Sequence, residues 1–209
     1  MNWAIALLMI SGVVVPPSPA RLVYEKSFPK SSYLPFVSIV VEKSGEAVYK
    51  EAPDDPQPIR FRLEKPETEA IFTLAGKLDY FGRPLESGLK VAQMGMKKFR
   101  YEDGVRTNEV SFNYSQDLDA QALADWFERI TETVRHSIEL ERTAKFDRLG
   151  VDRALIQLQV TVERNRLAGA EVLLPMLDRI AKNSVYMNRA RERAANIADF
   201  IRSGKPKSE

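Results

Sequence analysis

Alternating apolar and polar residues predict extended strands in the first half of the chain. Every second residue of 37–41 is apolar, the four residues that follow (Lys-Ser-Gly-Glu) have turn chemistry, and 47–50 provides a return segment. A second alternation covers 59–64, where Ile, Phe and Leu alternate with Arg, Arg and Glu. Because successive side chains of a strand point to opposite faces, these patterns predict three strands, each with one buried side.

A helix and a hairpin are predicted to follow. Pro66 suits the first turn of a helix, and the apolar residues from Ala70 to Phe81 recur at helical spacing. Asp103-Gly104 tolerates the backbone angles of a tight turn and would join strands at 96–102 and 105–114. The predicted fold class is therefore α+β, with a small antiparallel sheet (β-β-β-α-β-β) covered by one helix.

The last ninety residues show helical spacing. Asp117 or Asp119 can cap a helix over 117–146, which would be about 45 Å long at about 1.5 Å per residue. Either this helix bridges the sheet to the later helices, or it breaks between His136 and Lys145; we favour the bridge.

The remaining helices are predicted to form a C-terminal hairpin or bundle. Gly150 would end the long helix in a left-handed conformation, and Asp152 would cap the next one. Pro175 requires the following helix to start near Leu173 or to be kinked, and a final helix is expected over about 184–202.

The N-terminal segment resembles a secretory signal peptide. Residues 3–15 carry no charge, and 16–20 contain three prolines and a small-residue cleavage pattern. No Lys or Arg precedes the apolar stretch, so a wrongly chosen start codon or an N-terminal strand stays open. The predicted organisation is a signal peptide at 1–20, an α+β sheet domain at 21–116, a helical region at 117–203 and a disordered tail at 204–209, with a periplasmic or secreted location.

One stretch carries a resemblance to known proteins. Residues 34–130 follow the plan Ser-Gly-Glu-Ala-Val-Tyr, prolines, strand, helix, long loop, and a hairpin with Glu-Asp-Gly. In this plan the chain resembles uncharacterised secreted bacterial proteins of unknown function. The resemblance implies export, and it brings no activity or binding residue with it.

Composition excludes several kinds of site. The chain has 209 residues, no cysteine and one histidine, so it has neither disulfides nor thiolate chemistry, and a site built on two imidazoles is impossible in a monomer. Lys and Arg number 31 against 29 Asp and Glu. A nucleic-acid partner is not predicted, because neither half has a concentrated basic excess. Lys98 and Arg100 alternate with Phe99 and Tyr101, which predicts a strand with its charges outside and its rings inside.

No pattern typical of a catalytic or cofactor site is present. His136 lies one helical turn after Glu132 and could act as a general base, although an exposed helix residue is the more common interpretation. Asp54-Asp55 and the pair Asp117 and Asp119 could contact calcium, but turn and cap roles explain them better. We therefore predict no catalytic residue, no cofactor and no metal.

Two places are candidates for binding a partner. The long loop 82–95 contains Arg83, Glu86 and Lys90, and long loops often bind other molecules. The favoured alternative is that its apolar residues tuck over a sheet edge; these residues are Leu85, Leu89, Val91 and Met94. Arg189 and Arg193 form a candidate basic helix face for an anionic contact, against the interpretation of a solvated surface.

Three functions stay open at this point. The preferred one is an exported, non-catalytic module that binds a protein or a cell-envelope component and contacts the membrane only through an uncleaved signal segment. The second is a glycosidase-like hydrolase that uses carboxylates alone. The third is a structural oligomer in which the long helix forms a seam between chains; the oligomeric state itself is not predicted.

Overall fold

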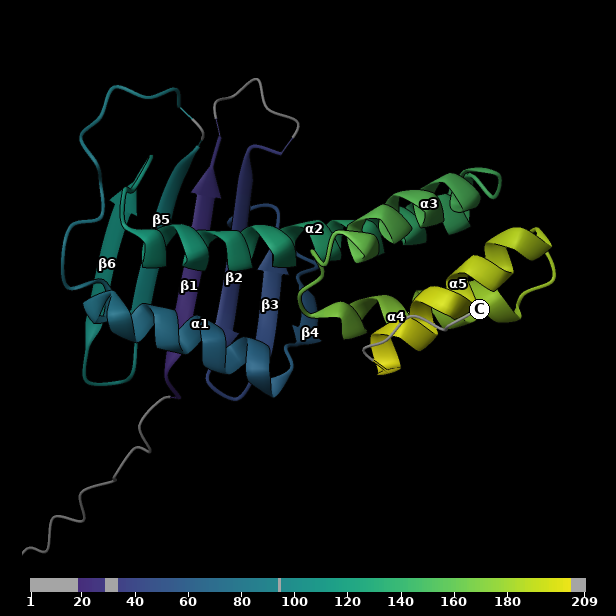
Figure 1. The fold of residues 1–209 in the computed structure, drawn as a ribbon, viewed down its shortest axis with the longest axis horizontal. Coiled ribbons are helices and arrows are strands. Elements are labelled where there is room, and N and C mark those ends of the chain that lie inside the picture. The colour runs from purple at the N-terminus through teal and green to yellow at the C-terminus, as the bar shows by residue number, and fades with distance from the viewer. Residues whose placement is uncertain (1–18, 29–33, 94, 204–209) are drawn as a thin grey trace, which may run out of the picture.

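The computed structural model describes residues 19–28, 34–93 and 95–203, and it confirms the α+β class. Apart from Pro19 and Ala20, the predicted signal peptide lies outside the described residues, as do Met94 and the predicted tail 204–209. A sheet at one end is joined to an arm of helices at the other (Figure 1).

The described chain forms a six-stranded antiparallel sheet with the order β4-β3-β2-β1-β5-β6. Its strands are β1 (Arg21–Ser27), β2 (Phe36–Glu42), β3 (Glu46–Lys50), β4 (Ile59–Arg62), β5 (Met96–Glu102) and β6 (Thr107–Phe112). The sequence analysis missed β1, although this strand lies at the centre and pairs with both β2 and β5. Only Leu22 and Tyr24 alternate inward on it, which is too short a pattern to stand out beside the apolar N-terminal segment.

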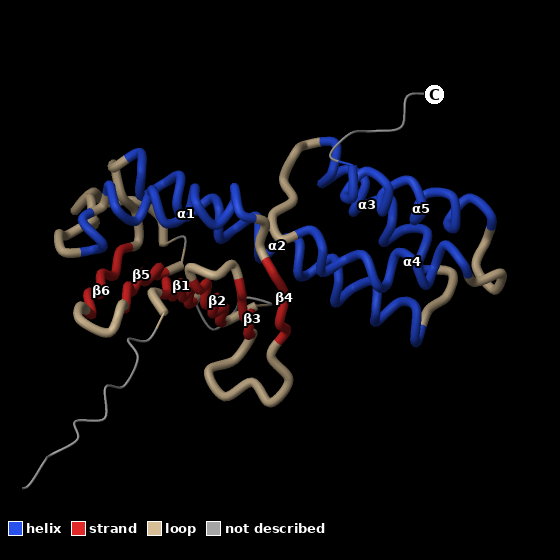
Figure 2. Tube along the Cα trace, turned by 90° about the horizontal axis from the view of Figure 1, so that it is seen from below, coloured by secondary structure: helices blue, strands red, loops and turns tan. Residues whose placement is uncertain are grey.

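Five α-helices and two short 3-10 turns complete the described chain. They are α1 (Lys65–Lys77), η1 (Asp79–Phe81), α2 (Leu118–Phe146), α3 (Gly150–Glu163), η2 (Ala170–Leu173), α4 (Leu174–Lys182) and α5 (Asn188–Ser203). Helix α1 and the first half of α2 lie across one face of the sheet (Figure 2). Of the two alternatives left open by Pro175, the structure has the first: α4 starts directly after Leu173, and the proline falls in its first turn.

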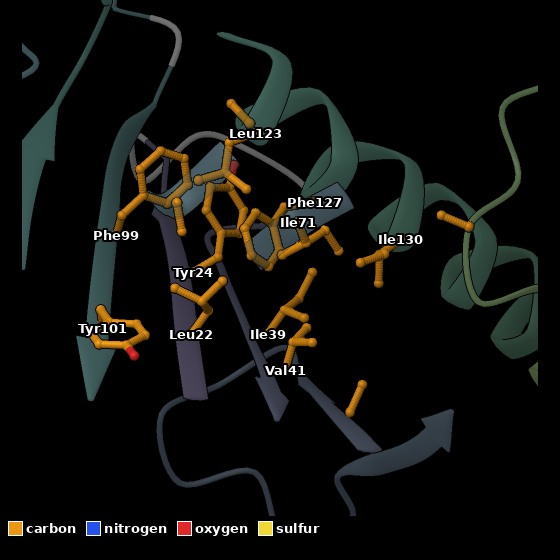
Figure 3. Close-up of a cluster of buried hydrophobic side chains, with 14 of the residues drawn as sticks. Leu22, Tyr24, Ile39, Val41, Ile71, Phe99, Tyr101, Leu123, Phe127 and Ile130 are labelled. Atoms are coloured by element: carbon orange, nitrogen blue, oxygen red, sulfur yellow. The ribbon is translucent and has the colours of Figure 1, made fainter. Parts of the chain in front are cut away.

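The first hydrophobic core fills the space between the sheet and these two helices. Side chains from β1, β2 and β5 point toward α1 and α2 (Figure 3). The rings of Tyr24 and Phe127 are stacked with centroids 4.7 Å apart, and Phe99 lies beside both. Phe99 and Tyr101 are buried as the alternation predicts.

The opposite face of the sheet carries mainly charged and polar side chains around a row of three paired valines, Val23, Val40 and Val48. In the described residues no helix covers this face (Figure 2). Lys98 lies 2.5 Å from Glu25 and 3.7 Å from Glu109, so its charge is neutralised across neighbouring strands. Lys98 and Arg100 therefore lie on the outer surface of the sheet, as the alternation predicts.

Helix α2 is continuous and belongs to two cores. Phe127 and Ile130 pack in the first core, whereas Leu140 packs in a second core formed with α3, α4 and α5. Asp117 caps the helix by accepting hydrogen bonds from the backbone N–H groups of Asp119 and Ala120, at 2.9 and 3.2 Å. The predicted bridge is thus present, and a division at residue 116 would separate the sheet from a helix that fills its core.

Helix α1 is shorter than predicted. It ends at Lys77, and the next turn places three consecutive non-glycine residues at positive φ, with 52° at Asp79, 46° at Tyr80 and 68° at Phe81. Such angles are costly for L-residues. The turn buries Phe81 against Phe99 and puts the Tyr80 ring 4.5 Å from Tyr101, and this packing offsets the strain.

The turn between α2 and α3 also differs from the prediction. Gly150 does not end α2 in a left-handed conformation; it is the first residue of α3, and its N–H donates to the Asp147 carboxylate at 3.0 Å. Asp152 does not cap α3 either, because it lies inside the helix and is buried. The N-cap residue is Leu149, which forms no side-chain cap bond, and the first N–H of the helix is instead satisfied by Asp147.

Gly169 forms the second connection between the arm and the sheet. Its N–H donates to the Glu67 carboxylate at 3.0 Å, and the same carboxylate accepts the N–H of Glu64 at 2.9 Å. Burial raises the pKa of Glu67, and these backbone hydrogen bonds oppose the rise. Gly169 has a φ of +68°, and a Cβ atom there would lie 2.8 Å from the ring of Phe61.

We predict that Gly169→Ala lowers the free energy of unfolding by about 3 kcal/mol, because it combines a left-handed alanine with a clash against Phe61. Gly88→Ala is the matched control, since Gly88 also has a φ of +68° but open space at its Cβ position. This control is expected to cost about 1 kcal/mol. Urea unfolding followed by circular dichroism measures both values, and equal losses would contradict the role assigned to the Phe61 contact.

Candidate functional site

The loop 82–95 lies against the segment that follows β6. Arg83 forms an ion pair with Asp117 at the N-terminus of α2, and this contact holds the pKa of Asp117 below its usual range. Glu86 accepts the N–H of Asn113 at 2.6 Å, and the N–H of Ser87 donates to the Tyr114 carbonyl at 2.8 Å. Two of the three candidate residues in this loop therefore have internal partners.

The apolar residues of the loop behave differently from one another. Leu85 is buried in the first core, whereas Leu89 and Val91 are exposed and Lys90 is exposed between them. The first part of the loop, with Leu85, thus packs against the sheet, whereas the part from Leu89 to Val91 is exposed to solvent. None of its residues lines either of the two hollows described below.

Arg189 and Arg193 do not form a free basic face. Both guanidinium groups contact the carboxylate of Asp152, at 2.9 and 2.5 Å. Asp152 is only 7% exposed, and Arg193 also donates to Gln159 at 3.0 Å. These contacts tie α5 to α3, so the two arginines act first as a structural clamp.

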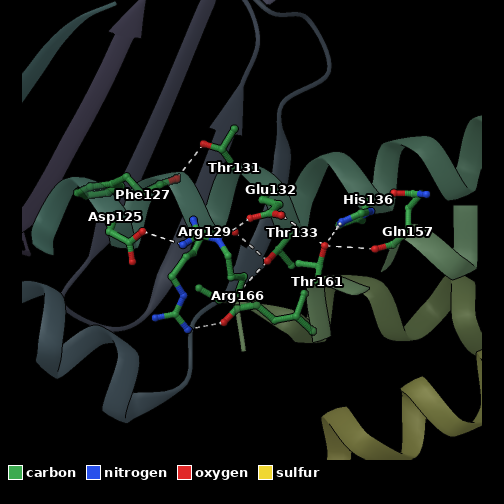
Figure 4. Close-up of polar contacts among 12 residues, drawn as sticks. Asp125, Phe127, Arg129, Thr131, Glu132, Thr133, His136, Gln157, Thr161 and Arg166 are labelled. Atoms are coloured by element: carbon green, nitrogen blue, oxygen red, sulfur yellow. Dashed lines mark hydrogen bonds and ion pairs between the residues drawn. The ribbon is translucent and has the colours of Figure 1, made fainter. Parts of the chain in front are cut away.

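His136 takes part in a polar network between α2 and α3 (Figure 4). Its Nε2 lies 2.8 Å from the Thr161 hydroxyl, and Glu132 lies 3.4 Å from the same hydroxyl. Arg166 donates to Glu132 and to Asp125, both at 2.9 Å. Burial lowers the pKa of His136, and the charge of Glu132 opposes this shift.

The contact between Thr161 and His136 has the separation of a nucleophile and its base, but its surroundings do not suit catalysis. Thr161 is buried in the last turn of α3, where its hydroxyl also donates to the Gln157 carbonyl at 3.3 Å. The neighbouring backbone N–H groups are used within the helix and cannot stabilise an oxyanion. The network therefore serves as a polar clasp between two helices.

A hollow of about 850 Å³ runs along α2 and α3 beside this clasp. Five carboxylates line it. Glu51 and Asp147 accept hydrogen bonds from the Tyr49 hydroxyl and the Gly150 N–H, each at 3.0 Å. The others pair with cations: Glu128 lies 2.5 Å from Lys26, and Glu139 lies 2.8 Å from Arg142. Glu132 is likewise held by Arg166. A carboxylate fixed by a cation is a poor general acid, so these three side chains are poorly suited to the acid role in glycoside cleavage.

A second hollow of about 740 Å³ lies between α1 and the sheet. Tyr80 and Tyr101 line it, and the guanidinium of Arg106 stands 4.8 Å from the centre of the Tyr80 ring. The aromatic surface is thus occupied by contacts within the chain, and we assign no ligand to this hollow.

The acidic pairs considered for calcium have local roles. Asp117 caps α2, and Asp55 accepts backbone N–H groups of Glu51 and Gln57 at 3.2 and 2.9 Å. Within the described residues, no cluster of three or more His, Asp or Glu side chains is arranged to hold a metal ion.

Sequence analysis missed a surface at the far end of the helical arm. Phe146 and Leu149 at the α2–α3 turn are 75% and 79% exposed, and Val185 and Met187 at the α4–α5 turn are 55% and 41% exposed. The two turns lie side by side in both overall views, and the Tyr186 hydroxyl is 3.5 Å from the Ala144 carbonyl. We call these four exposed residues the apolar tip. A signal was available, because turns normally carry polar residues.

Comparisons with known proteins add no family. No protein-family model matches the chain, and no curated protein matches it significantly. None of the helices in the described ranges combines the length and apolar character needed to cross a bilayer.

We predict that Asp152→Asn lowers the free energy of unfolding by about 2 kcal/mol, because it leaves Arg189 and Arg193 together without their carboxylate. Asp178→Asn is the control, since Asp178 pairs with Arg202 at the surface and its loss should cost less than about 1 kcal/mol. Thermal and urea unfolding measure both changes. A larger loss for the control would show that the clamp is not important for the arm.

A pH dependence follows from His136. Its folded-state pKa is lowered by burial, so the folded state favours the neutral ring, and the stability from this residue is present above about pH 6.5 and lost as the pH falls below that value. Arg135 lowers this pKa further, whereas Glu132 and Glu139 raise it. Between about pH 7.5 and 5 the wild type should lose more stability than His136→Gln. If the urea midpoints of the wild type and of His136→Gln change by the same amount across this range, the prediction is contradicted.

Proposed function

We propose that this protein is an exported, non-catalytic binding module that docks on a protein or another component of the cell envelope through its apolar tip. The arm is the binding element, and the sheet with its two covering helices is the body that supports it. The proposal keeps the function class favoured by the sequence and moves the contact from the loop 82–95 to the end of the arm.

The observation that carries the proposal is the exposure of four large apolar side chains on two adjacent turns. Each buried apolar side chain gains about 1.5–3 kcal/mol relative to its exposed form, so leaving four together in water forgoes a substantial stabilisation. Clusters of this kind on folded proteins mark surfaces that another molecule covers. The residues lie where polar side chains would serve the turns equally well.

Export is supported by the N-terminal sequence. An uncharged apolar segment followed by small residues and prolines is typical of a secretory signal, and a chain without cysteine folds alike in oxidising and reducing surroundings. A periplasmic or secreted location is part of the proposal.

The two other functions have less support. A carboxylate hydrolase needs a free acidic pair. Along the larger hollow, Glu128, Glu132 and Glu139 are each held by a cation. The two remaining carboxylates, Glu51 and Asp147, accept hydrogen bonds within the chain. An oligomer built on α2 needs an available apolar stripe. The stripe of α2 is already buried in its own two cores, from Leu123 to Leu140.

Site-specific photo-crosslinking in cells that export the protein tests the proposed function. A benzophenone amino acid at Leu149 should give adducts with envelope components, because this side chain lies in the apolar tip. The same group at Val105, which is 91% exposed on the β5–β6 turn, is the control and should give few adducts. Equal adduct yields at the two positions would overturn the proposal.

A further inference from the structure

We propose that the apolar tip inserts into an anionic lipid surface. This inference rests on the proposed function and specifies its partner: the tip enters the interfacial region of the bilayer, while basic side chains around it contact lipid phosphates. The contact differs from any anchoring by the N-terminal apolar segment, because it involves the opposite, C-terminal part of the chain.

Positive charge is concentrated around the tip. Residues 145–153 and 179–189 contain six Lys and Arg against two Asp and Glu, although the whole chain is nearly balanced. These six basic residues are all exposed. They are Lys145, Arg148, Arg153, Arg179, Lys182 and Arg189.

The two acidic residues of this region are engaged within the protein. Asp147 accepts the Gly150 N–H at 3.0 Å, and Asp152 is buried between Arg189 and Arg193. The other five basic side chains form no ion pair within 4 Å among the described residues, although, besides the Arg202 hydrogen bond, the charge of Lys182 helps to lower the pKa of Asp178. Each basic residue near an anionic membrane contributes about 1 kcal/mol of attraction, so this imbalance is sufficient to direct the tip to such a surface.

Cationic and apolar groups alternate within the same turn. The ammonium of Lys145 lies 5.0 Å from the centre of the exposed Phe146 ring, and Arg148 directly precedes Leu149. At a bilayer interface, these two kinds of side chain lie at different depths. The apolar side chain enters the boundary of the acyl chains, and the long basic side chain reaches the lipid phosphates.

The small size of the apolar tip favours a lipid surface over a protein. The two turns lie at the far end of the arm (Figure 1), and the tip comprises only four exposed apolar residues. A stable protein interface usually takes about 20–30 residues on each side. A bilayer accepts a small protrusion, and it also supplies the negative charge that the surrounding cations require.

The tip is held in place before it binds. Tyr186, between Val185 and Met187, is buried in the second core, and Val151 next to Gly150 is buried there too. The two turns are therefore fixed by the packing of α2, α3 and α5. Binding loses little conformational entropy as a result, and few exposed residues are enough.

Vesicle co-sedimentation tests the inference with the full chain. All proteins carry Leu8→Asp and Val14→Asp, so that the apolar N-terminal segment cannot itself enter a bilayer. The probes are vesicles of phosphatidylcholine alone and vesicles with about one-third phosphatidylglycerol. We expect about tenfold tighter binding to the anionic vesicles, weakened by salt, because it depends on a few exposed cations.

Two double variants distinguish binding through the apolar tip from nonspecific adsorption of exposed apolar residues. Phe146→Ser with Leu149→Ser should reduce binding about tenfold or more. Val105→Ser with Leu118→Ser removes two residues that are 91% and 78% exposed on the sheet part, and it should change binding less than about twofold. Circular dichroism and thermal unfolding confirm that each variant is folded.

A third double variant tests the charge around the tip. Lys182→Glu with Arg148→Glu should abolish the preference for anionic vesicles.

Equal binding to the two kinds of vesicle, or equal losses in the two serine variants, would overturn the lipid inference. If vesicles fail to bind while crosslinking at Leu149 still yields protein adducts, the partner is a protein: the lipid inference fails and the proposed function stands. If neither experiment gives a signal specific to the tip, both fail.

Discussion

The packing of α2 into two hydrophobic cores is the constraint that shapes this protein. Phe127 and Ile130 close the core over the sheet, and Leu140 closes the core of the arm. Thr133 lies at the junction, where its hydroxyl donates to the Arg129 carbonyl at 2.9 Å and accepts the Ala168 N–H at 3.1 Å. Because a helix bends little without a proline or a bulge, the direction of α2 fixes the direction of the arm.

The return of the chain after α3 reinforces this arrangement. Arg129 donates to the Leu167 carbonyl at 2.8 Å, and Gly169 donates to Glu67 on α1, so the linker is fastened to both helices that cover the sheet. The arm is thus attached through α2 itself and through the 167–169 segment. Two attachments oppose hinge motion better than one, and the exposed turns at the far end keep a fixed relation to the sheet.

Periodicity predicts the elements that bury one regular face, and it fails where contacts distant in sequence decide the outcome. The strands from β2 onward and the full length of α2 follow from their apolar spacing. Strand β1 was missed because it has only two inward residues, and its place in the sheet is determined by pairing with β2 and β5, which are distant in sequence. Asp152 was assigned as a cap because nothing local reveals Arg189 and Arg193, about forty residues later. The exposure of Leu149 could have been suspected from an apolar residue in a turn.

The length of α2 also determines how far the distal turns lie from the sheet. About twelve residues separate Val134, the last α2 residue buried in the sheet core, from Phe146, which corresponds to about 18 Å at about 1.5 Å per residue. Electrostatic fields in physiological salt decay over about 8 Å. If the distal turns rest on a charged surface, the sheet therefore lies farther from that surface than its electrostatic field extends. The ion pair of Glu25 and Lys98 would then be as stable as it is in free solution.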